Sequence, residues 1–232
     1  METLTNWNEA LTEFGIDFNV AKRPLYAAVE GGGAQLVPNL YSIVRSDTNK
    51  PLPGVAVNGR YETIQTSAFA DVANYLVGET KAEFIGGGEF NDGRIVWVQA
   101  RMPDSIRVKG TDDRIEKNLT FITGHDGSLC FMVMPETLRV FCANQMNAFM
   151  QSARNNGVKI RHTKSADARL AQAGDTLLSV MDAYRAFEVK CNFLADTRMT
   201  DIQLEAAMRK VFGVKENLPQ EDIATRTKNN ME

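Results

Sequence analysis

Three residues close together in the chain have the side chains of a hydrolytic centre. His125, Asp126 and Ser128 stand in "TGHDGSL", and such groups serve as general bases and nucleophiles in many enzymes. A triad is formed in space, however, and neighbours along a strand point to opposite sides of it. Asp126-Gly127 is also a strong signal for the turn of a β-hairpin. We therefore predict a turn here and no catalytic residue, with a metal-dependent nuclease or other hydrolase using His125 and Asp126 as the alternative.

Metal and cofactor sites have little support in the sequence. The only histidines are His125 and His162, and there is no Cys-x-x-Cys pair, so a zinc site is not predicted. A magnesium site made of carboxylates stays open, but the spacing of the acids does not favour it; they are Asp104, Asp112, Asp113 and Asp126. Neither "GGG" stretch matches a nucleotide-binding loop. We interpret 31–33 as a flexible connection and 86–88 as a bulge or a close backbone approach. We expect no metal and no cofactor.

The charge of the chain is unevenly distributed. The net charge is −3, yet residues 139–169 hold six basic residues and one acid, Asp167, for a local charge of +5. A local basic stretch in an acidic protein indicates contact with phosphate groups. We expect its cations to lie in a loop between two helices. Aromatic residues of the preceding β-region belong mostly to the core, but Trp97 on "RIVWVQAR" is a candidate for stacking on bases. The predicted nucleic-acid-binding residues are Arg94, Trp97, Arg101, Arg139, Arg154, Lys159, Arg161, His162 and Lys164.

Local patterns predict the elements that position these residues. A short helix in "NWNEALTEFG" is capped by Asn6, and a second helix follows Thr66 or Ser67 and ends at Gly78. Strands are predicted near 40–45 and 54–58, followed by two hairpins. Their turns are "NDG" at 91–93 and "HDGS" at 125–128, and Pro135 ends the second hairpin. "CANQMNAFMQSARNNG" is a further predicted helix.

The longest predicted element begins at Ser165. Its apolar residues alternate spacings of three and four over about 25 residues, roughly 38 Å of helix. Such a stripe packs against its own domain or against another copy of the chain. Thr200 and Gln203 form a capping box for a last helix that ends at Gly213. The stripe consists of Leu170, Ala173, Leu177, Val180, Tyr184, Phe187, Cys191 and Leu194.

Length and composition indicate a soluble globular protein, and the order of the predicted elements indicates an α+β fold. The 232 residues are 44% hydrophobic and 24% charged, which suits a globular fold. We expect an antiparallel sheet of two or more hairpins with helices on one face, followed by long C-terminal helices. The predicted domains are an α+β core (1–160), a helical extension (161–213) and a flexible polar tail (214–232). Three widely spaced cysteines predict buried thiols in a reducing compartment, and no signal peptide or membrane span is expected, so we place the protein in the bacterial cytoplasm.

The sequence contains three distinctive blocks, "GRY…IQ", "HDGS" and "RVFCANQMNA". Together with the segments between them, over about residues 4–195, they resemble a family of phage- and plasmid-like bacterial proteins, domain of unknown function 932. The sequence departs mildly from the family at Phe141 and at Gln145-Met146. The family name carries no activity but implies residence on mobile elements. The expected order of elements also resembles, in outline, the RecT/Red-beta class of single-strand annealing proteins.

The resemblance and the basic segment together predict a non-catalytic protein. We expect it to bind single-stranded DNA in recombination or replication and to act as an oligomer, a ring or filament. A phage protein that binds a host protein is a further alternative, and it would show an exposed apolar patch without a continuous basic track. The C-terminal tail is a candidate site for a protein partner.

Overall fold

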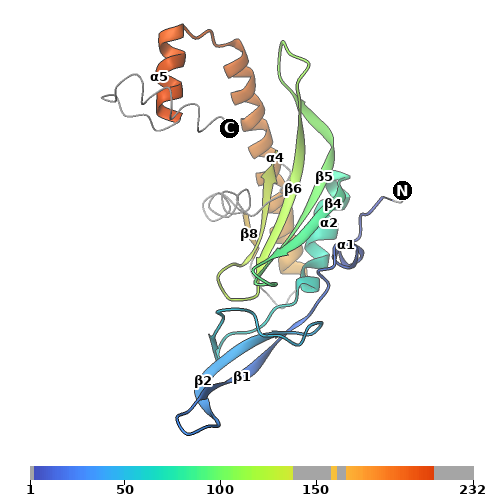
Figure 1. Cartoon of the computed structure of the whole chain (residues 1–232). Coiled ribbons are helices and arrows are strands. Elements are labelled where there is room, and N and C mark those ends of the chain that lie inside the picture. The colour runs from blue at the N-terminus through green and yellow to red at the C-terminus, as the bar shows by residue number, and fades with distance from the viewer. Residues whose placement is uncertain (1–2, 138–157, 161–165, 212–232) are drawn as a thin grey trace, which may run out of the picture. The chain divides into compact units, whose positions relative to one another are not determined.

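The computed structural model describes residues 3–137, 158–160 and 166–211 (Figure 1). The chain divides into two compact units, residues 1–189 and 190–232, and each is described by itself. Five predicted nucleic-acid-binding residues and the helix predicted over 142–157 lie outside the described residues. Those five residues are Arg139, Arg154, Arg161, His162 and Lys164.

The first unit is built around a five-stranded antiparallel sheet. Its strands, in spatial order, are β4 (Glu83–Phe90), β5 (Ile95–Arg107), β6 (Arg114–Gly124), β7 (Phe131–Glu136) and β8 (Val158–Ile160). Both predicted hairpins are confirmed, and the β4–β5 turn places Asn91, Asp92 and Gly93 at positive φ. The expected end of the second hairpin at Pro135 is wrong, because β7 continues to Glu136. Within the part of the chain that the structure describes, β8 pairs with residues 131–133 of β7 and no strand pairs with β7 at Pro135 on that side, so the missing N–H of Pro135 is tolerated.

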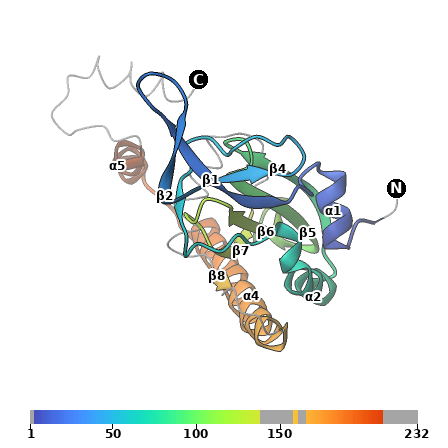
Figure 2. The same cartoon turned by 90° about the horizontal axis from the view of Figure 1, so that it is seen from below.

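Three helices cover one face of this sheet (Figure 2). They are α1 (Trp7–Glu13), α2 (Ala70–Thr80), which follows the 3₁₀ turn η1 (Thr66–Phe69), and the first part of α4 (Ala166–Asp196). The Asn6 side chain caps α1 by accepting hydrogen bonds from the backbone N–H groups of Asn8 and Glu9. The predicted end of α2 at Gly78 is wrong. The helix continues to Thr80 because Lys81 adopts the left-handed conformation that ends it.

The core between the helices and the sheet is rich in aromatic residues. The Trp7 ring makes edge contacts with Phe84, Phe121 and Phe131, with ring centroids 5.4 to 6.1 Å apart. Phe69 stacks on Phe131 at 3.9 Å, so α1, η1 and three strands share one cluster. Phe121 and Phe131 are fully buried, as expected for most of the aromatic residues in this region.

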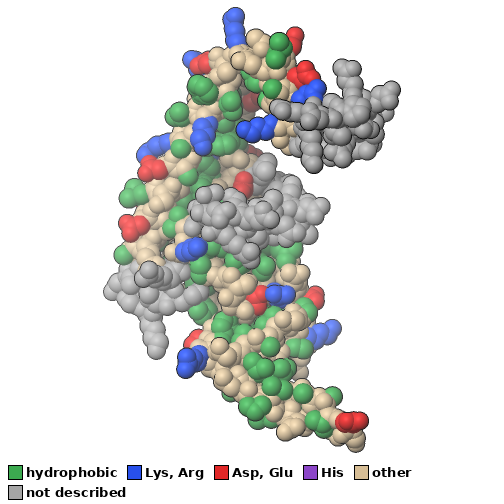
Figure 3. Space-filling model, turned by 90° about the vertical axis from the view of Figure 1, so that its left-hand side faces the viewer, with side chains coloured by type: hydrophobic (Ala, Val, Ile, Leu, Met, Phe, Trp, Pro, Cys, Tyr) green, Lys and Arg blue, Asp and Glu red, His purple; other side chains and the backbone are tan. Residues whose placement is uncertain are grey.

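A separate three-stranded sheet corrects the expectation of a single sheet. It consists of β1 (Val20–Ala28), β2 (Ala34–Arg45) and β3 (Val57–Asn58). The sequence did not predict β1, and β2 starts six residues before the expected strand at 40–45. The part of the β1–β2 hairpin that extends past β3 is mostly exposed. It ends in a loop at 31–33 whose three glycines have positive φ. Hydrophobic side chains gather over this hairpin at the lower end of Figure 3, among them Tyr26, Val29 and Leu36.

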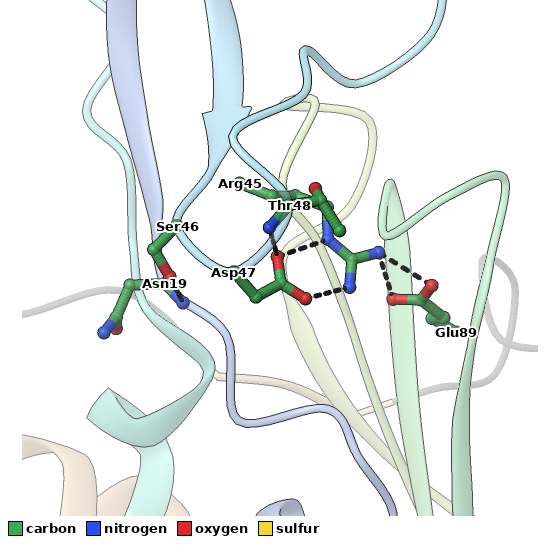
Figure 4. Close-up of polar contacts among 6 residues, drawn as sticks. All are labelled: Asn19, Arg45, Ser46, Asp47, Thr48 and Glu89. Atoms are coloured by element: carbon green, nitrogen blue, oxygen red, sulfur yellow. Dashed lines mark hydrogen bonds and ion pairs between the residues drawn. The ribbon is translucent and has the colours of Figure 1, made fainter.

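A largely buried arginine fastens the two sheets together (Figure 4). Arg45 at the end of β2 donates to both carboxylate oxygens of Glu89 on β4, at 2.7 and 2.6 Å. Its other nitrogens bond Asp47, and its guanidinium lies 3.8 Å from the centre of the Phe18 ring. The hydrogen bonds to Asp47 and Glu89 raise the pKa of Arg45, so its charge is permanent. The first unit is therefore an α+β fold with two linked antiparallel sheets.

The second unit contains the end of α4 and the helix α5 (Asp201–Val211). The predicted capping box is confirmed, since the Thr200 N–H donates to the Gln203 side chain and the Gln203 N–H donates to the Thr200 hydroxyl. No helix among the described residues, the 31-residue α4 included, is long and apolar enough to cross a bilayer.

Candidate functional site

The "HDGS" segment forms the β6–β7 turn, as predicted, and His125 is enclosed by the fold. His125 is 1% exposed, its Nε2 lies 3.2 Å from the Thr66 hydroxyl, and its ring packs edge-on against Phe18. Burial lowers the pKa of His125 to about 4. Its buried Nδ1 has no hydrogen-bond partner among the described residues. The imidazole is therefore neutral at physiological pH and serves as a packed core group.

Asp126 stabilises the same turn. Its carboxylate accepts hydrogen bonds from the Ser128 backbone N–H at 2.9 Å and from the Arg94 guanidinium at 2.8 and 3.1 Å. Burial alone would raise the pKa of Asp126, but the hydrogen bonds from Ser128 and Arg94 lower it below its usual value. The carboxylate is thus charged and fully engaged in positioning the turn, which matches the structural interpretation of this motif.

Trp97 and Lys159 lie in one row across the second face of the five-stranded sheet. The register pairs Trp97 with Ile122, Ile122 with Met132, and Met132 with Lys159, so all four side chains share that face. Trp97 stacks on Phe90 at 6.4 Å, and both rings are half-buried. Ile122 and Met132 between them are buried, so the row offers an aromatic pair at one end and a cation at the other.

Arg94 and Arg101 face acidic partners, which reduces their availability to phosphate. Arg94 pairs with Asp126, whose side chain is only 5% exposed. Arg101 bonds Glu83 at 2.5 Å and lies 3.9 Å from Glu116, and the hydrogen bond to Glu83 raises its pKa. Their predicted role in a DNA groove therefore requires each arginine to bind phosphate in addition to its acid.

Lys159 does not lie in a loop, which corrects that expectation. It is the middle residue of β8, an edge strand, and it is exposed. The sequence signal for a strand was weak because three residues are too short to show a pattern. Of the nine predicted nucleic-acid-binding residues, Trp97, Arg101 and Lys159 lie on the five-stranded sheet and Arg94 lies in its β4–β5 turn, whereas the other five are outside the described residues.

The acids considered for a metal site do not converge in the part of the chain that the structure describes. No group of three or more potential metal ligands is found among residues 3–137, 158–160 and 166–211. Asp104 instead pairs with Lys117 at 2.5 Å, and Asp126 pairs with Arg94. Cys130 and Cys191 are free and only partly buried, which corrects the prediction of buried thiols for these two.

Sequence reasoning missed the polar residues that share a row with Arg101. Register places Glu83, Arg101, Asn118 and Glu136 side by side across four strands. Asn118 is fully buried, and neither atom of its side-chain amide has a hydrogen-bond partner. Asn118, a polar residue within the apolar strand sequence "KNLTFI", is the feature of the sequence that could have indicated this position.

The fold is that of an α+β protein with a polar cluster at the β6–β7 turn, and comparison with known protein families identifies the family of the chain. The family described as Domain of unknown function (DUF932) matches residues 55–232, and the chain belongs to it. No curated protein and no solved structure matches the chain.

Proposed function

We propose that this protein binds single-stranded DNA and does not cleave it, acting in recombination or replication on a phage or plasmid. One observation carries the proposal. β8, which lies within the +5 segment 139–169, is an edge strand of the described five-stranded sheet, and its Lys159 is exposed. A row of basic residues near an edge strand can bind successive phosphates of single-stranded DNA. Binding without sequence preference depends on such a row of charges more than on a specific pocket.

The aromatic pair supports the same function. Trp97 and Phe90 are half-buried on the face where Lys159 lies, three strands away, or about 14 Å at 4.8 Å per strand step. A strand of DNA that follows the cations would bring bases within reach of this face. Stacking on an aromatic ring adds affinity without demanding a sequence, as an annealing protein requires.

The hydrolase alternative draws less support from the turn at residues 125–128. His125 is neutral and buried, and Asp126 is bound to Arg94 and Ser128. A nucleophile or metal would need these groups to be accessible and uncommitted.

A protein-binding function is the second candidate, and the exposed β1–β2 hairpin favours it. Tyr26 and Leu36 face each other across the two strands and are more than half exposed, and Val29 lies in the adjoining loop. Exposed apolar side chains gathered on one element mark interaction surfaces in many soluble proteins (Figure 3).

The experiment compares two triple variants that remove the same charge. Lys159→Ala/Arg161→Ala/Lys164→Ala neutralises the basic segment, and the control neutralises three exposed cations of the three-stranded sheet and its loops, Arg23, Lys50 and Arg60. Fluorescence anisotropy with labelled single-stranded and duplex DNA is measured at several salt concentrations with Mg²⁺ present. Afterwards the DNA is recovered and its length is checked on a gel.

We expect the first variant to lose single-strand affinity by about 10- to 100-fold and to reduce the salt slope by roughly two to three, while the control stays near wild type. Unchanged affinity in the first variant would refute the proposed role of the segment. Shortened DNA would favour the hydrolase. An absence of binding by the wild type at every salt concentration would leave the protein-binding function.

A further inference from the structure

The helix α4 uses one face to pack against its own sheet. Ala173, Thr176 and Val180 are fully buried on this face, and Tyr184 is nearly so. The Tyr184 hydroxyl closes the contact, since it donates to the Asn118 carbonyl and accepts from the Glu136 N–H at 3.0 Å. From Ala173 to Tyr184, the apolar stripe of α4 is therefore packed into the core of the first unit.

The same stripe continues after Tyr184 without cover. Its next members are Phe187, Cys191 and Leu194, at spacings of three, four and three residues. Phe187 is 37% exposed and Leu194 is 67% exposed, and Cys191 is only partly buried. None of the twelve side chains from Arg185 to Asp196 is buried, which is about 18 Å of helix.

The helix α5 repeats this feature. Leu204, Met208 and Val211 recur at spacings of four and three, which places them on one face, and they are 52%, 36% and 75% exposed. No side chain of α5 is buried. An 11-residue helix has little stability in water unless its apolar face is packed. Both helical segments therefore present apolar faces that need a partner.

The spacing of the stripe indicates that the partner is another helix. Alternation of three and four is the repeat of a helix–helix seam, in which side chains of one helix fit between those of the other. The charges of this region indicate which kind of partner carries that helix. From Asp182 to Val211 there are five acidic and five basic residues, interspersed along the chain, so the segment is neutral.

A neutral, mixed surface attracts neither a nucleic acid nor an anionic membrane, which need an excess of Lys and Arg. Two copies of such a surface can pack together, because acidic residues of one copy can lie beside basic residues of the other and the two surfaces carry no net charge that would repel.

We propose that a second copy of this chain covers the exposed apolar stripe of α4 at Phe187, Cys191 and Leu194, helix against helix. This self-association surface does not rest on DNA binding, since the basic segment and the sheet face take no part in it. It gives the protein a means to form an assembly before any other ligand is present.

The test uses the full chain and two charge substitutions in the same stretch of helix. Leu194→Glu places a carboxylate on the stripe. Val189→Glu is the matched control, because Val189 is 68% exposed and lies five residues away, about 140° around the helix. Sedimentation velocity is measured without DNA over about a hundredfold range of protein concentration. Thermal unfolding checks that both variants remain folded.

We expect the wild type and Val189→Glu to sediment as dimers or larger assemblies and Leu194→Glu to dissociate to monomers. Each dimer loses two buried leucines, so the dissociation constant rises by roughly 100-fold or more. A wild-type monomer at every concentration overturns the proposal. So does an assembly that Leu194→Glu leaves intact, or one that Val189→Glu weakens equally. Because none of these readouts involves DNA, failure of the single-strand proposal would leave this result unaffected.

Discussion

Acidification is expected to weaken the fold through His125. In the unfolded chain this side chain binds a proton below pH 6.5, whereas in the folded protein burial lowers its pKa to about 4. Between these two values the unfolded state binds more protons than the native state. The free energy of unfolding therefore falls as the pH falls through this window, and the stability conferred by neutral His125 is fully present only above about pH 6.5.

The size of the effect follows from the two pKa values. A difference of about 2.5 units corresponds to about 3 kcal/mol at 1.36 kcal/mol per unit. Carboxylates also titrate in this range, so the measurement needs a reference that lacks only the imidazole. His125→Gln is suitable, because an amide keeps a polar contact to Thr66 and does not titrate.

Chemical denaturation at a series of pH values is the assay for this prediction. The difference in unfolding free energy between wild type and His125→Gln should shrink by about 3 kcal/mol from about pH 6.5 to pH 4. In a His162→Gln background the imidazole of His125 is the sole histidine signal, and NMR titration should give a pKa near 4. A pKa near 6.5, or a constant free-energy difference, would refute the enclosed neutral imidazole and return His125 to the list of accessible acid–base groups.

Two further predictions concern packing and are measured by denaturation midpoints. Gly87→Ala places a Cβ 2.5 Å from the Phe14 ring and should destabilise the protein by about 1–3 kcal/mol. Gly78 lies on the exposed face of α2, and a Cβ there meets nothing within 4 Å, so Gly78→Ala should stabilise the protein by about 0.5–1 kcal/mol. Equal effects of the two changes would contradict the close approach at Gly87. Tyr184→Phe removes a hydroxyl that bonds two strands and should cost about 1–3 kcal/mol, and a neutral result would contradict those bonds.

Much of the fold was predictable because its signals are local. The Asn6 cap, the two hairpin turns and the Thr200–Gln203 capping box depend on residues within a few positions of each other. The interpretation of "GGG" at 86–88 as a bulge or close approach is also confirmed. The register shifts between Phe84 and Gly86, and Gly87 lies against Phe14. Caps and turns form through hydrogen bonds and backbone preferences within a few residues, so the local sequence is enough to predict them.

The charge partners of the predicted arginines could not be read from the chain. A hairpin counted from Phe90 opposite Ile95 would place Phe84 opposite Arg101. The bulge after Phe84 moves the register by one residue, so Glu83 faces Arg101 instead. A one-residue shift moves side chains to the other face of a strand. The "GGG" stretch at 86–88 indicated a bulge or a close approach, but not which acid the shift would bring opposite Arg101.

The sequence by itself determined the secondary-structure class, the turns, the basic segment and the apolar stripe of α4. Only the tertiary structure decided that His125 is enclosed, that Lys159 belongs to an edge strand and that the stripe is covered as far as Tyr184 and bare at Leu194. The physical reason is the range of the interactions. Helix periodicity and turn preference arise between neighbours, whereas burial and strand register depend on residues that lie far apart in the chain.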